Sequence, residues 1–241
     1  MDLSVDIRRA LRSAQRTFDL QVRFTVGEDL AVLYGPSGAG KSVTLLAIAG
    51  LLRPDAGAIR FGEVTLFDSA TGIDVPARHR RIGYVFQDYA LFPHRTIEQN
   101  VAAALVLLLG QRLPVAARQR VDELLDAFEL TAVARSYPHQ VSGGQRERTA
   151  LARALAAGPR LLLLDEPFNA LDTELRARMR REVLQVWERF HVPTLLITHD
   201  AADVAAFGRQ VIVIENGRIV ARDGARSGVP APGVTPARVP G

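Results

Sequence analysis

A loop of eight residues constrains the fold of this chain more than any other segment. It reads Gly35-Pro36-Ser37-Gly38-Ala39-Gly40-Lys41-Ser42 and matches the pattern G-x-x-x-x-G-K-[ST]. The apolar residues 32–34 before it predict a buried strand, and residues 43–48 after it predict a helix. The order of strand, glycine-rich loop and helix predicts an α/β fold with a phosphate-binding loop at one end of a parallel sheet.

Lys41 is the only lysine among the 30 cationic side chains of the chain. A compact ammonium on a thin stem can lie along a tight loop and contact the β- and γ-phosphates of a nucleotide, whereas a guanidinium is too wide. The glycines let backbone amides converge on phosphate, and the helix that Val43 continues adds its dipole. We therefore expect residues 35–43 to bind a nucleotide, with the Ser42 hydroxyl as a ligand of Mg²⁺.

Length and composition limit the class of protein. With 241 residues, 48% hydrophobic and 23% charged, we expect one globular domain with an inserted lobe. There is no cysteine for a disulfide or a thiolate site, residues 1–16 lack the apolar run of a signal peptide, and the longest apolar stretch, 101–109, is about half a bilayer span. The net charge is only +4, so nucleic-acid binding is not expected, and the arginine-rich residues 176–181 predict a solvated helix face.

Hydrophobic periodicity divides the chain into a core and an insertion. Residues 18–26 alternate like a half-buried antiparallel strand, 59–61 and 64–66 continue this pattern, and 82–86 predict a short strand that ends at Gln87. From about residue 88 to 157 the pattern is helical and interrupted by prolines, which predicts an inserted helical lobe.

The second half of the chain returns to the sheet. Fully apolar strands are expected at 161–164 and 194–197 on either side of a long helix, 174–190, and a hairpin is expected around Glu215-Asn216-Gly217. Beyond Gly224 the chain is rich in Pro and Gly without periodicity. We therefore expect one nucleotide-binding domain over 1–223 and a flexible tail over 224–241.

Two further segments carry chemistry. The strand at 161–164 delivers Asp165 and Glu166 at its C-terminal end, where α/β sheets place their ligands. We expect Asp165 to hold Mg²⁺ through water and Glu166 to act as the general base for the attacking water. The second segment, Ser142-Gly143-Gly144-Gln145, offers a hydroxyl, free amides and a helix dipole at a helix start. Two anion sites on one domain suggest a two-fold dimer in which each Ser142 turn covers the γ-phosphate held by its partner.

With these motifs the chain resembles the ATP-binding subunits of ABC transporters over residues 18 to about 222. The phosphate loop at 35–42, the glutamine loop at Gln87, the signature at 141–145 with Val141 in place of Leu, and the strand motif at 161–166 occur in the family's order. The dimer-contact loop then matches Asn169-Ala170-Leu171-Asp172, and the switch histidine matches His199.

The resemblance implies a RecA-like P-loop NTPase core with an antiparallel β layer and a helical lobe. It implies ATP and Mg²⁺ as cofactors, with Gln87 touching Mg²⁺ or the attacking water, His199 donating a hydrogen bond to the γ-phosphate, and Asp172 contacting the partner's nucleotide site. One departure concerns adenine: the family's stacking aromatic falls near residues 8–16, which contain none, so Arg12 is the substitute we expect to stack by its guanidinium plane. Selectivity for ATP over GTP stays open.

Residues 68–94 are most similar to the ATPase subunits of molybdate importers, and sulfate importers share much of this segment. The resemblance implies a homodimer on the cytoplasmic face of the inner membrane, bound to an integral permease and served indirectly by a periplasmic oxyanion-binding protein. Contact with the permease is expected near Tyr89, Leu91, Phe92 and His94. The regulatory domain that such subunits commonly carry is not in this sequence, so we expect a short form or a domain elsewhere.

Two other classes of function are weighed against the importer ATPase. A soluble ATP-driven clamp in DNA repair or translation would be expected to add a coiled coil or a second cassette, and this sequence has neither. A nucleotide-binding scaffold without catalysis is disfavoured, because Lys41, Asp165, Glu166 and His199 are all present.

Overall fold

The computed structural model describes residues 2–12, 17–27, 30–109, 112–169 and 173–224. The helices are α1 Lys41–Ala49, α2 Ile97–Leu109, α3 Val115–Ala127, α4 Gly143–Ala156, α5 Thr173–Phe190 and α6 Ala201–Phe207, with 3₁₀ turns η1 Ala77–His79, η2 Thr131–Val133 and η3 Pro138–Gln140. The strands are β1 Leu3–Arg12, β2 Thr17–Val26, β3 Leu30–Tyr34, β4 Ala56–Phe61, β5 Val64–Asp68, β6 Ile73–Asp74, β7 Ile82–Val85, β8 Leu161–Asp165, β9 Thr194–Thr198, β10 Gln210–Glu215 and β11 Arg218–Gly224. Of the tail expected over 224–241, Gly224 instead ends β11, and residues 225–241 lie outside the described residues.

All strands of the described residues join one sheet in the order β6-β5-β4-β1-β2-β11-β10-β3-β9-β8-β7. The strands from β6 to β2 pair antiparallel, whereas β10, β3, β9, β8 and β7 run parallel to one another. The parallel strands β8 and β9 are buried along their whole length, because both faces of the sheet are covered. The predicted fold class, a parallel P-loop core with an antiparallel β layer, is confirmed.

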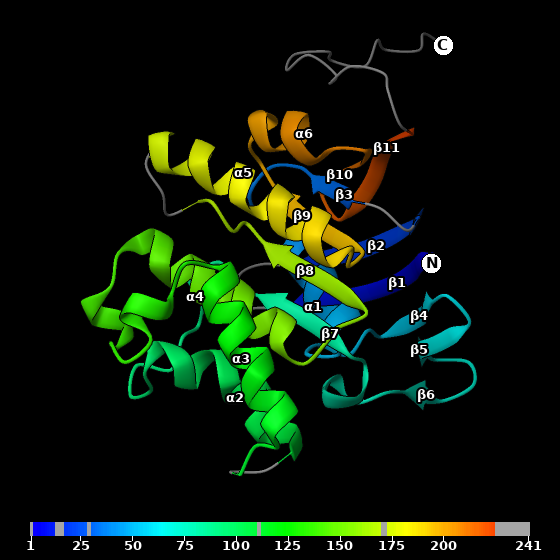
Figure 1. The fold of residues 1–241 in the computed structure, drawn as a ribbon. Coiled ribbons are helices and arrows are strands. Elements are labelled where there is room, and N and C mark those ends of the chain that lie inside the picture. Colours follow the sequence, from blue (N-terminus) through cyan, green and yellow to red (C-terminus); the bar gives the residue numbers. More distant parts are fainter. Residues whose placement is uncertain (1, 13–16, 28–29, 110–111, 170–172, 225–241) are drawn as a thin grey trace, which may run out of the picture.

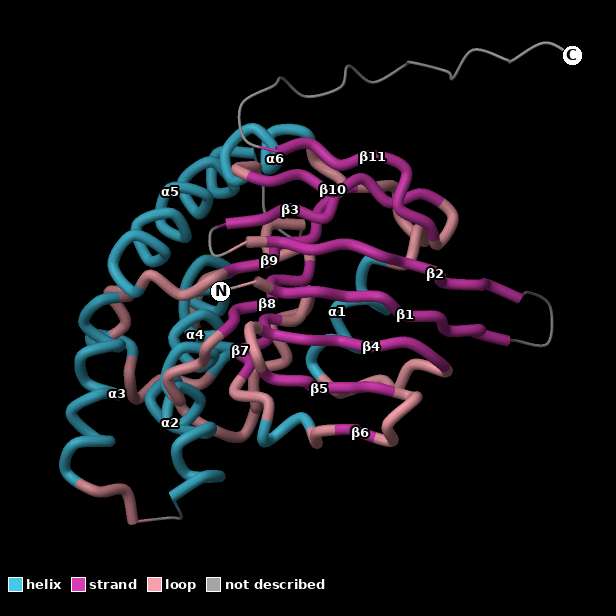
Figure 2. The backbone as a smooth tube through the Cα atoms, turned by 90° about the vertical axis from the view of Figure 1, so that its right-hand side faces the viewer, coloured by secondary structure: helices cyan, strands magenta, loops and turns pink. Residues whose placement is uncertain are grey.

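The strongly curved sheet encloses α1. Figure 2 shows α1 between the antiparallel strands on one side and the parallel strands, with the other helices beyond them, on the other. One hydrophobic core fills this space, where Leu45 and Ile48 of α1 meet Val22, Phe24 and Ile59 of the antiparallel strands. The phosphate loop, which leads into α1, is therefore anchored between the two halves of the sheet.

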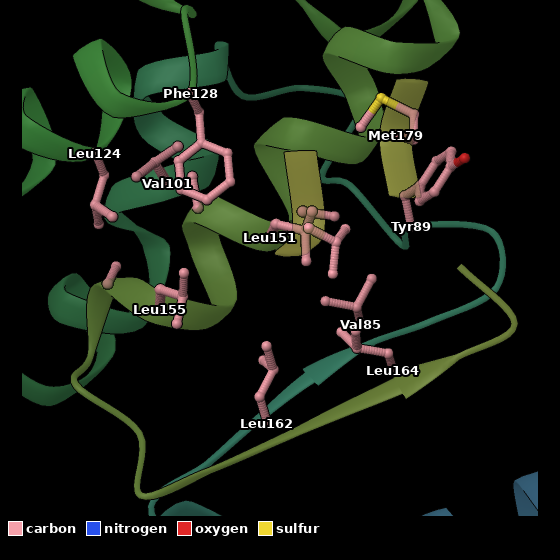
Figure 3. Close-up of a cluster of buried hydrophobic side chains, with 14 of the residues drawn as sticks. Val85, Tyr89, Val101, Leu124, Phe128, Leu151, Leu155, Leu162, Leu164 and Met179 are labelled. Carbon is pink, nitrogen blue, oxygen red and sulfur yellow. The ribbon is translucent and has the colours of Figure 1, made fainter. Parts of the chain in front are cut away.

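A second hydrophobic core holds the helical segment to the opposite face of the parallel strands (Figures 1 and 3). Leu151 and Leu155 of α4 pack between Leu162 and Leu164 of β8 and the residues of α2 and α3, including Val101. Residues 88–157, expected as the inserted lobe, contain α2, α3 and α4, and α4 connects this segment to the sheet.

The sequence did not indicate β1, which pairs with β2 over the whole of both strands. The solvated helix face expected at residues 176–181 is also partly wrong, because the side chain of Arg180 is only 15% exposed and binds the carboxylates of Asp200 and Asp203. Arg80, in a charged run, is buried and donates to the carbonyls of Ala47 and Ile48 at the C-terminal end of α1. A guanidinium there satisfies carbonyls that have no partner within the helix.

Candidate active site

The phosphate loop connects the end of β3 to α1. Its backbone needs left-handed conformations at Gly38 (φ 79°) and Gly40 (φ 102°), which only glycine adopts without strain. No side chain caps the first turn of α1, since its N-cap residue is Gly40. The first amides of the helix therefore face the loop and are open to an anion.

Lys41 is buried, with 3% of its surface exposed, and its Nζ atom lies inside the loop. It donates hydrogen bonds to the carbonyl oxygens of Gly35 (2.9 Å) and Pro36 (3.0 Å), and forms an ion pair with Glu166 Oε1 at 3.1 Å. The ammonium thus lies next to the carboxylate that follows β8, and Lys41 and Glu166 are neighbours in one cluster.

Ser42 and Asp165 form the second part of this site. Ser42 Oγ donates to Asp165 Oδ1 at 3.0 Å, and the Tyr84 hydroxyl donates to Asp165 Oδ2 at 2.9 Å. Burial raises the pKa of Asp165, an effect that these two hydrogen bonds oppose. A hydroxyl beside a carboxylate is a donor set that suits Mg²⁺, which binds through one or two protein oxygens together with phosphate oxygens and water. The residues therefore fit the expected metal.

Glu166 lies at the centre of the site. Its Oε2 atom accepts a hydrogen bond from Asn169 Nδ2 at 2.7 Å and lies 3.3 Å from Nδ1 of His199, while Oε1 binds Lys41. Its backbone has a positive φ of 45°, an unusual conformation for a residue with a side chain. Three segments far apart in sequence, the phosphate loop, residues 166–169 and the loop of His199, thus place three polar side chains around one carboxylate.

The loop that carries His199 is fixed by ionic contacts with α5. Asp203 accepts hydrogen bonds from Thr198 Oγ1 at 2.5 Å and from Arg180 Nε at 2.6 Å, and Asp200 binds Arg180 and Arg176. Although burial alone would raise the pKa of Asp200, the Ala202 amide and the two arginines hold it below its ordinary value. The His199 side chain stays 41% exposed and directed at Glu166, so it is available to a ligand.

The segment after β7 holds Gln87 in an exposed turn, and no hydrogen bond joins Gln87 to Asp165 or Ser42 among the described residues. The next residues, Tyr89 and Ala90, both have positive φ (63° and 44°), and Arg153 of α4 donates to their carbonyls at 2.6 and 2.7 Å. This strained turn therefore links the sheet to α4, which is the place expected for a coupling element.

The predicted permease contact needs a correction at two of its residues. Tyr89 is buried at 6% exposure, because its ring packs in the core of the helical lobe (Figure 3) and its hydroxyl lies 3.5 Å from the Pro167 carbonyl. Leu91 is only partly exposed and packs against the same core. Phe92 does line a groove of about 780 Å³, together with Tyr84, Phe86, Leu107 and Leu108, between α2, α4 and β7.

The segment 142–145 starts α4 as a capping box. Ser142 Oγ accepts from the Gln145 amide at 3.2 Å, and Gln145 Oε1 accepts from the Ser142 amide at 2.9 Å. The amides of Gly143 and Gly144 fall in the first turn, where they have no acceptor within the helix. Ser142 is exposed, so the turn is presented outward. The last expected site residue, Asp172, and its neighbours Ala170 and Leu171 lie outside the described residues.

An aromatic ring beside the phosphate loop was missed in the sequence. A side-chain atom at Gly40 would come within 3.1 Å of the Phe18 ring and 2.6 Å of Leu20, so both side chains of β2 lie against the loop. Phe18 is half-buried, whereas Arg12, the expected substitute for an adenine-stacking aromatic, is exposed at the end of β1. Phe18 is the first apolar residue of the strand predicted at 18–26. The alternation of that strand could have indicated that the ring of Phe18 faces the same side of the sheet as Leu20.

Comparison with known proteins assigns this geometry to a family. The ABC transporter family profile matches residues 19–169, which include the phosphate loop, the Ser142 turn and the two carboxylates. The chain is similar to the solved dimeric cassette MJ0796 bound to ADP and Pi, with a TM-score of 0.79 and 28% identity over 95% of this chain and all of that one.

Curated relatives are importer subunits with different cargo. The chain is 43% identical to the sulfate/thiosulfate import ATP-binding protein CysA of Caulobacter vibrioides (87% of this chain, 62% of the relative) and 46% identical to the Fe(3+) ions import ATP-binding protein FbpC 2 of Pectobacterium atrosepticum (78% and 52%). It is 38% identical to the molybdenum import ATP-binding protein ModC of Paramagnetospirillum magneticum (97% and 62%). The chain thus spans between half and two thirds of these relatives. Among the described residues, no helix is both long and apolar enough to cross a bilayer.

Proposed function

The chain belongs to the ABC transporter family, and on that premise we propose that it hydrolyses MgATP to power import through a membrane permease. The observation that carries the proposal is the convergence of Lys41, Asn169 and His199 on Glu166, next to the Ser42–Asp165 pair. A phosphate-binding loop alone supports nucleotide binding, whereas a carboxylate held among these donors also supports hydrolysis.

In the proposed reaction a water molecule attacks the γ-phosphorus through its oxygen, and Glu166 accepts the proton that this water loses. The bond between the γ-phosphorus and the bridging oxygen breaks, and ADP leaves with the electron pair. Lys41 moves from the carbonyls of Gly35 and Pro36 to the β- and γ-phosphates, and His199 donates to a γ-phosphate oxygen. Mg²⁺, held by Ser42, through water by Asp165, and by Gln87, would neutralise charge on the phosphates.

We assign the nucleotide base to Phe18 in place of Arg12. The ring lies against Gly40 at the start of α1, so a base bound beside the loop would have an aromatic side chain next to it. Stacking of a base on an aromatic ring stabilises binding by about 1–3 kcal/mol. Because stacking reads no donor or acceptor pattern, this contact favours ATP over GTP only weakly.

The second anion site is assigned to a partner copy. Ser142 is exposed at the start of α4, whereas the phosphate loop is part of the sheet core. A head-to-tail pair of chains would place each Ser142, with Gly143, Gly144 and Gln145, over the γ-phosphate at the partner's loop, and Asp172 would contact the partner. The dimeric state of the similar cassette MJ0796 supports this arrangement.

The groove of about 780 Å³ is the proposed permease contact. Leu107 is 80% exposed and Phe92 39% exposed, while Arg78, Arg81 and Arg153 line the same groove. This combination fits an apolar helix with an acidic residue. Because Arg153 also holds the Tyr89 and Ala90 carbonyls, a helix in the groove would act on the turn that carries Gln87. The chain would then lie on the cytoplasmic face of the inner membrane.

For the cargo we propose an oxyanion, with molybdate ahead of sulfate. The relative named for molybdenum import aligns with 97% of this chain, the largest share among the three relatives above, although the sulfate and iron relatives are more identical. Capture of the oxyanion outside the membrane would fall to a periplasmic binding protein.

The test is reconstitution of this chain with a permease that copurifies with it from its native membrane. We expect ATP-dependent uptake of molybdate that Glu166→Gln abolishes, and uptake of sulfate or iron alone would reassign the cargo. Copurification with ribosomes or DNA and with no permease would instead support the soluble clamp.

A further inference from the structure

A second charged cleft lies away from the phosphate loop, where α3 and α4 of the lobe meet α5. It has a volume of about 410 Å³ and is lined by Glu129, Arg148, Arg178, Arg181, Arg189 and Phe190, among others. In Figure 2, α5 and α3 follow one another along the same side of the molecule. The walls of the cleft therefore come both from the lobe and from the helix that follows the catalytic strand β8.

The cleft is strongly cationic. Its lining residues include four arginines and one carboxylate. Arg178, Arg181 and Arg189 are spaced by three and eight residues along α5, so they share one face of the helix, and the like charges of Arg178 and Arg181 repel each other there. Arg120 of α3, which is paired with Glu123 at 3.5 Å, lies 5.1 Å from the Phe190 ring at the side of the cleft. An anion in the cleft would relieve this repulsion.

The carboxylate of Glu129 already forms ion pairs with two arginines of the cleft. Its Oε2 atom is 2.9 Å from Arg148 NH1 of α4 and 3.8 Å from Arg178 NH2 of α5. The Glu129 side chain is nevertheless 74% exposed, and its backbone has a positive φ of 53°. One exposed carboxylate thus bridges the lobe and α5 between Arg148 and Arg178.

We propose that this cleft is a further anion-binding site, separate from the phosphate loop and the Ser142 turn, which takes a tetrahedral oxyanion of two or more charges, either free or as a phosphate ester. The planar forks of Arg181 and Arg189 match the paired oxygens of phosphate or sulfate, and Arg148 faces them from the lobe. A bound anion ties the lobe to α5 and so opposes lobe movement during turnover. This last consequence rests on the proposed function, whereas the binding site does not.

The experiment measures thermal unfolding of protein saturated with Mg²⁺ and AMP-PNP, so that the phosphate loop is filled. The variant is Arg181→Ala/Arg189→Ala, and its control, Arg60→Ala/Arg135→Ala, removes two exposed arginines outside the cleft. Each protein is titrated to 20 mM with sodium sulfate, inorganic phosphate or glycerol phosphate, and with NaCl of equal ionic strength. The first two report free oxyanions and the third an ester.

We expect sulfate or phosphate to raise the unfolding midpoint of wild type and control by about 2–4 °C more than that of the cleft variant. Sulfate should also lower ATPase activity of wild type more than that of the cleft variant. An equal rise in all three proteins, or none beyond NaCl, overturns the site. If the double alanine variant does not fold, Arg181→Lys/Arg189→Lys keeps the charge and should lose part of the excess shift. The rise in the unfolding midpoint on adding AMP-PNP alone measures binding at the nucleotide site. The proposed ATPase function and the proposed anion cleft can therefore fail independently of each other.

Discussion

Replacing Glu166 by Gln changes one atom of the candidate site and removes its proton acceptor. The carboxylate has three polar neighbours, Lys41 Nζ at 3.1 Å, His199 Nδ1 at 3.3 Å and Asn169 Nδ2 at 2.7 Å. A glutamine has a single acceptor oxygen, so its NH₂ group must face either Lys41 or Asn169, which are both donors. One of these contacts is therefore lost together with the basicity of the group.

The two losses differ in size. A positioned general base contributes about 10²–10⁴-fold to a rate, or roughly 3–5 kcal/mol of barrier. One lost hydrogen bond changes ground-state binding by about 1 kcal/mol, or roughly five-fold in affinity. We therefore expect kcat of Glu166→Gln to fall at least 100-fold while the Kd for ATP changes by less than about ten-fold.

Steady-state phosphate release and equilibrium binding of a fluorescent ATP analogue measure the two quantities. The matched control is Asn169→Ala, which also removes one contact of Glu166 but leaves the carboxylate, so its kcat should fall less than ten-fold. Turnover of Glu166→Gln within ten-fold of wild type, or equal losses in both variants, would refute the role of Glu166 as general base.

Three other variants test separate parts of the account. Phe18→Ala should weaken ATP binding about 5–150-fold in equilibrium titrations, with affinity restored by Phe18→Tyr; unchanged affinity would remove the ring from the base site. Burial raises the pKa of Asp165, so ionising it costs stability as pH rises above about 3.8. Asp165→Asn should therefore unfold at a higher temperature than wild type at pH 7 without nucleotide, yet lose Mg²⁺-dependent turnover, and a lower midpoint in calorimetry would contradict this. Leu107→Glu should abolish copurification with the permease while ATP binding persists, because the exposed groove position becomes charged; retained copurification would place the contact elsewhere.

The sequence predicted those parts of the molecule whose signals are local. The phosphate loop, the strands β8 and β9 and the helix start at residues 142–145 each follow from a few consecutive residues, and the structure has these elements where expected; the capping box at Ser142 was not predicted. The hairpin turn was also predicted, because Asn216 and Gly217 are residues that adopt positive φ readily.

The contacts that the sequence did not predict join distant segments. Tyr84 reaches Asp165 across 81 residues, and Phe18 meets Gly40 only because β2 passes the start of α1. Arg80 belongs to a charged run and is nevertheless buried, since the carbonyls at the end of α1 bind it. Tyr89 was expected at the surface, but its ring completes the core of the lobe. In each case the burial and the partners of the side chain depend on tertiary packing, which the charge or polarity of the neighbouring residues in sequence does not determine.

The mass of Glu166→Gln in solution, measured by light scattering with and without MgATP, tests the central claim most directly. If the Ser142 turn of one chain covers the γ-phosphate at the loop of another, ATP should convert the 26.3 kDa monomer to a dimer of about twice that mass. ADP should not do so, and Ser142→Arg should block the change by filling the exposed turn. A chain that binds ATP tightly and stays monomeric would contradict the account.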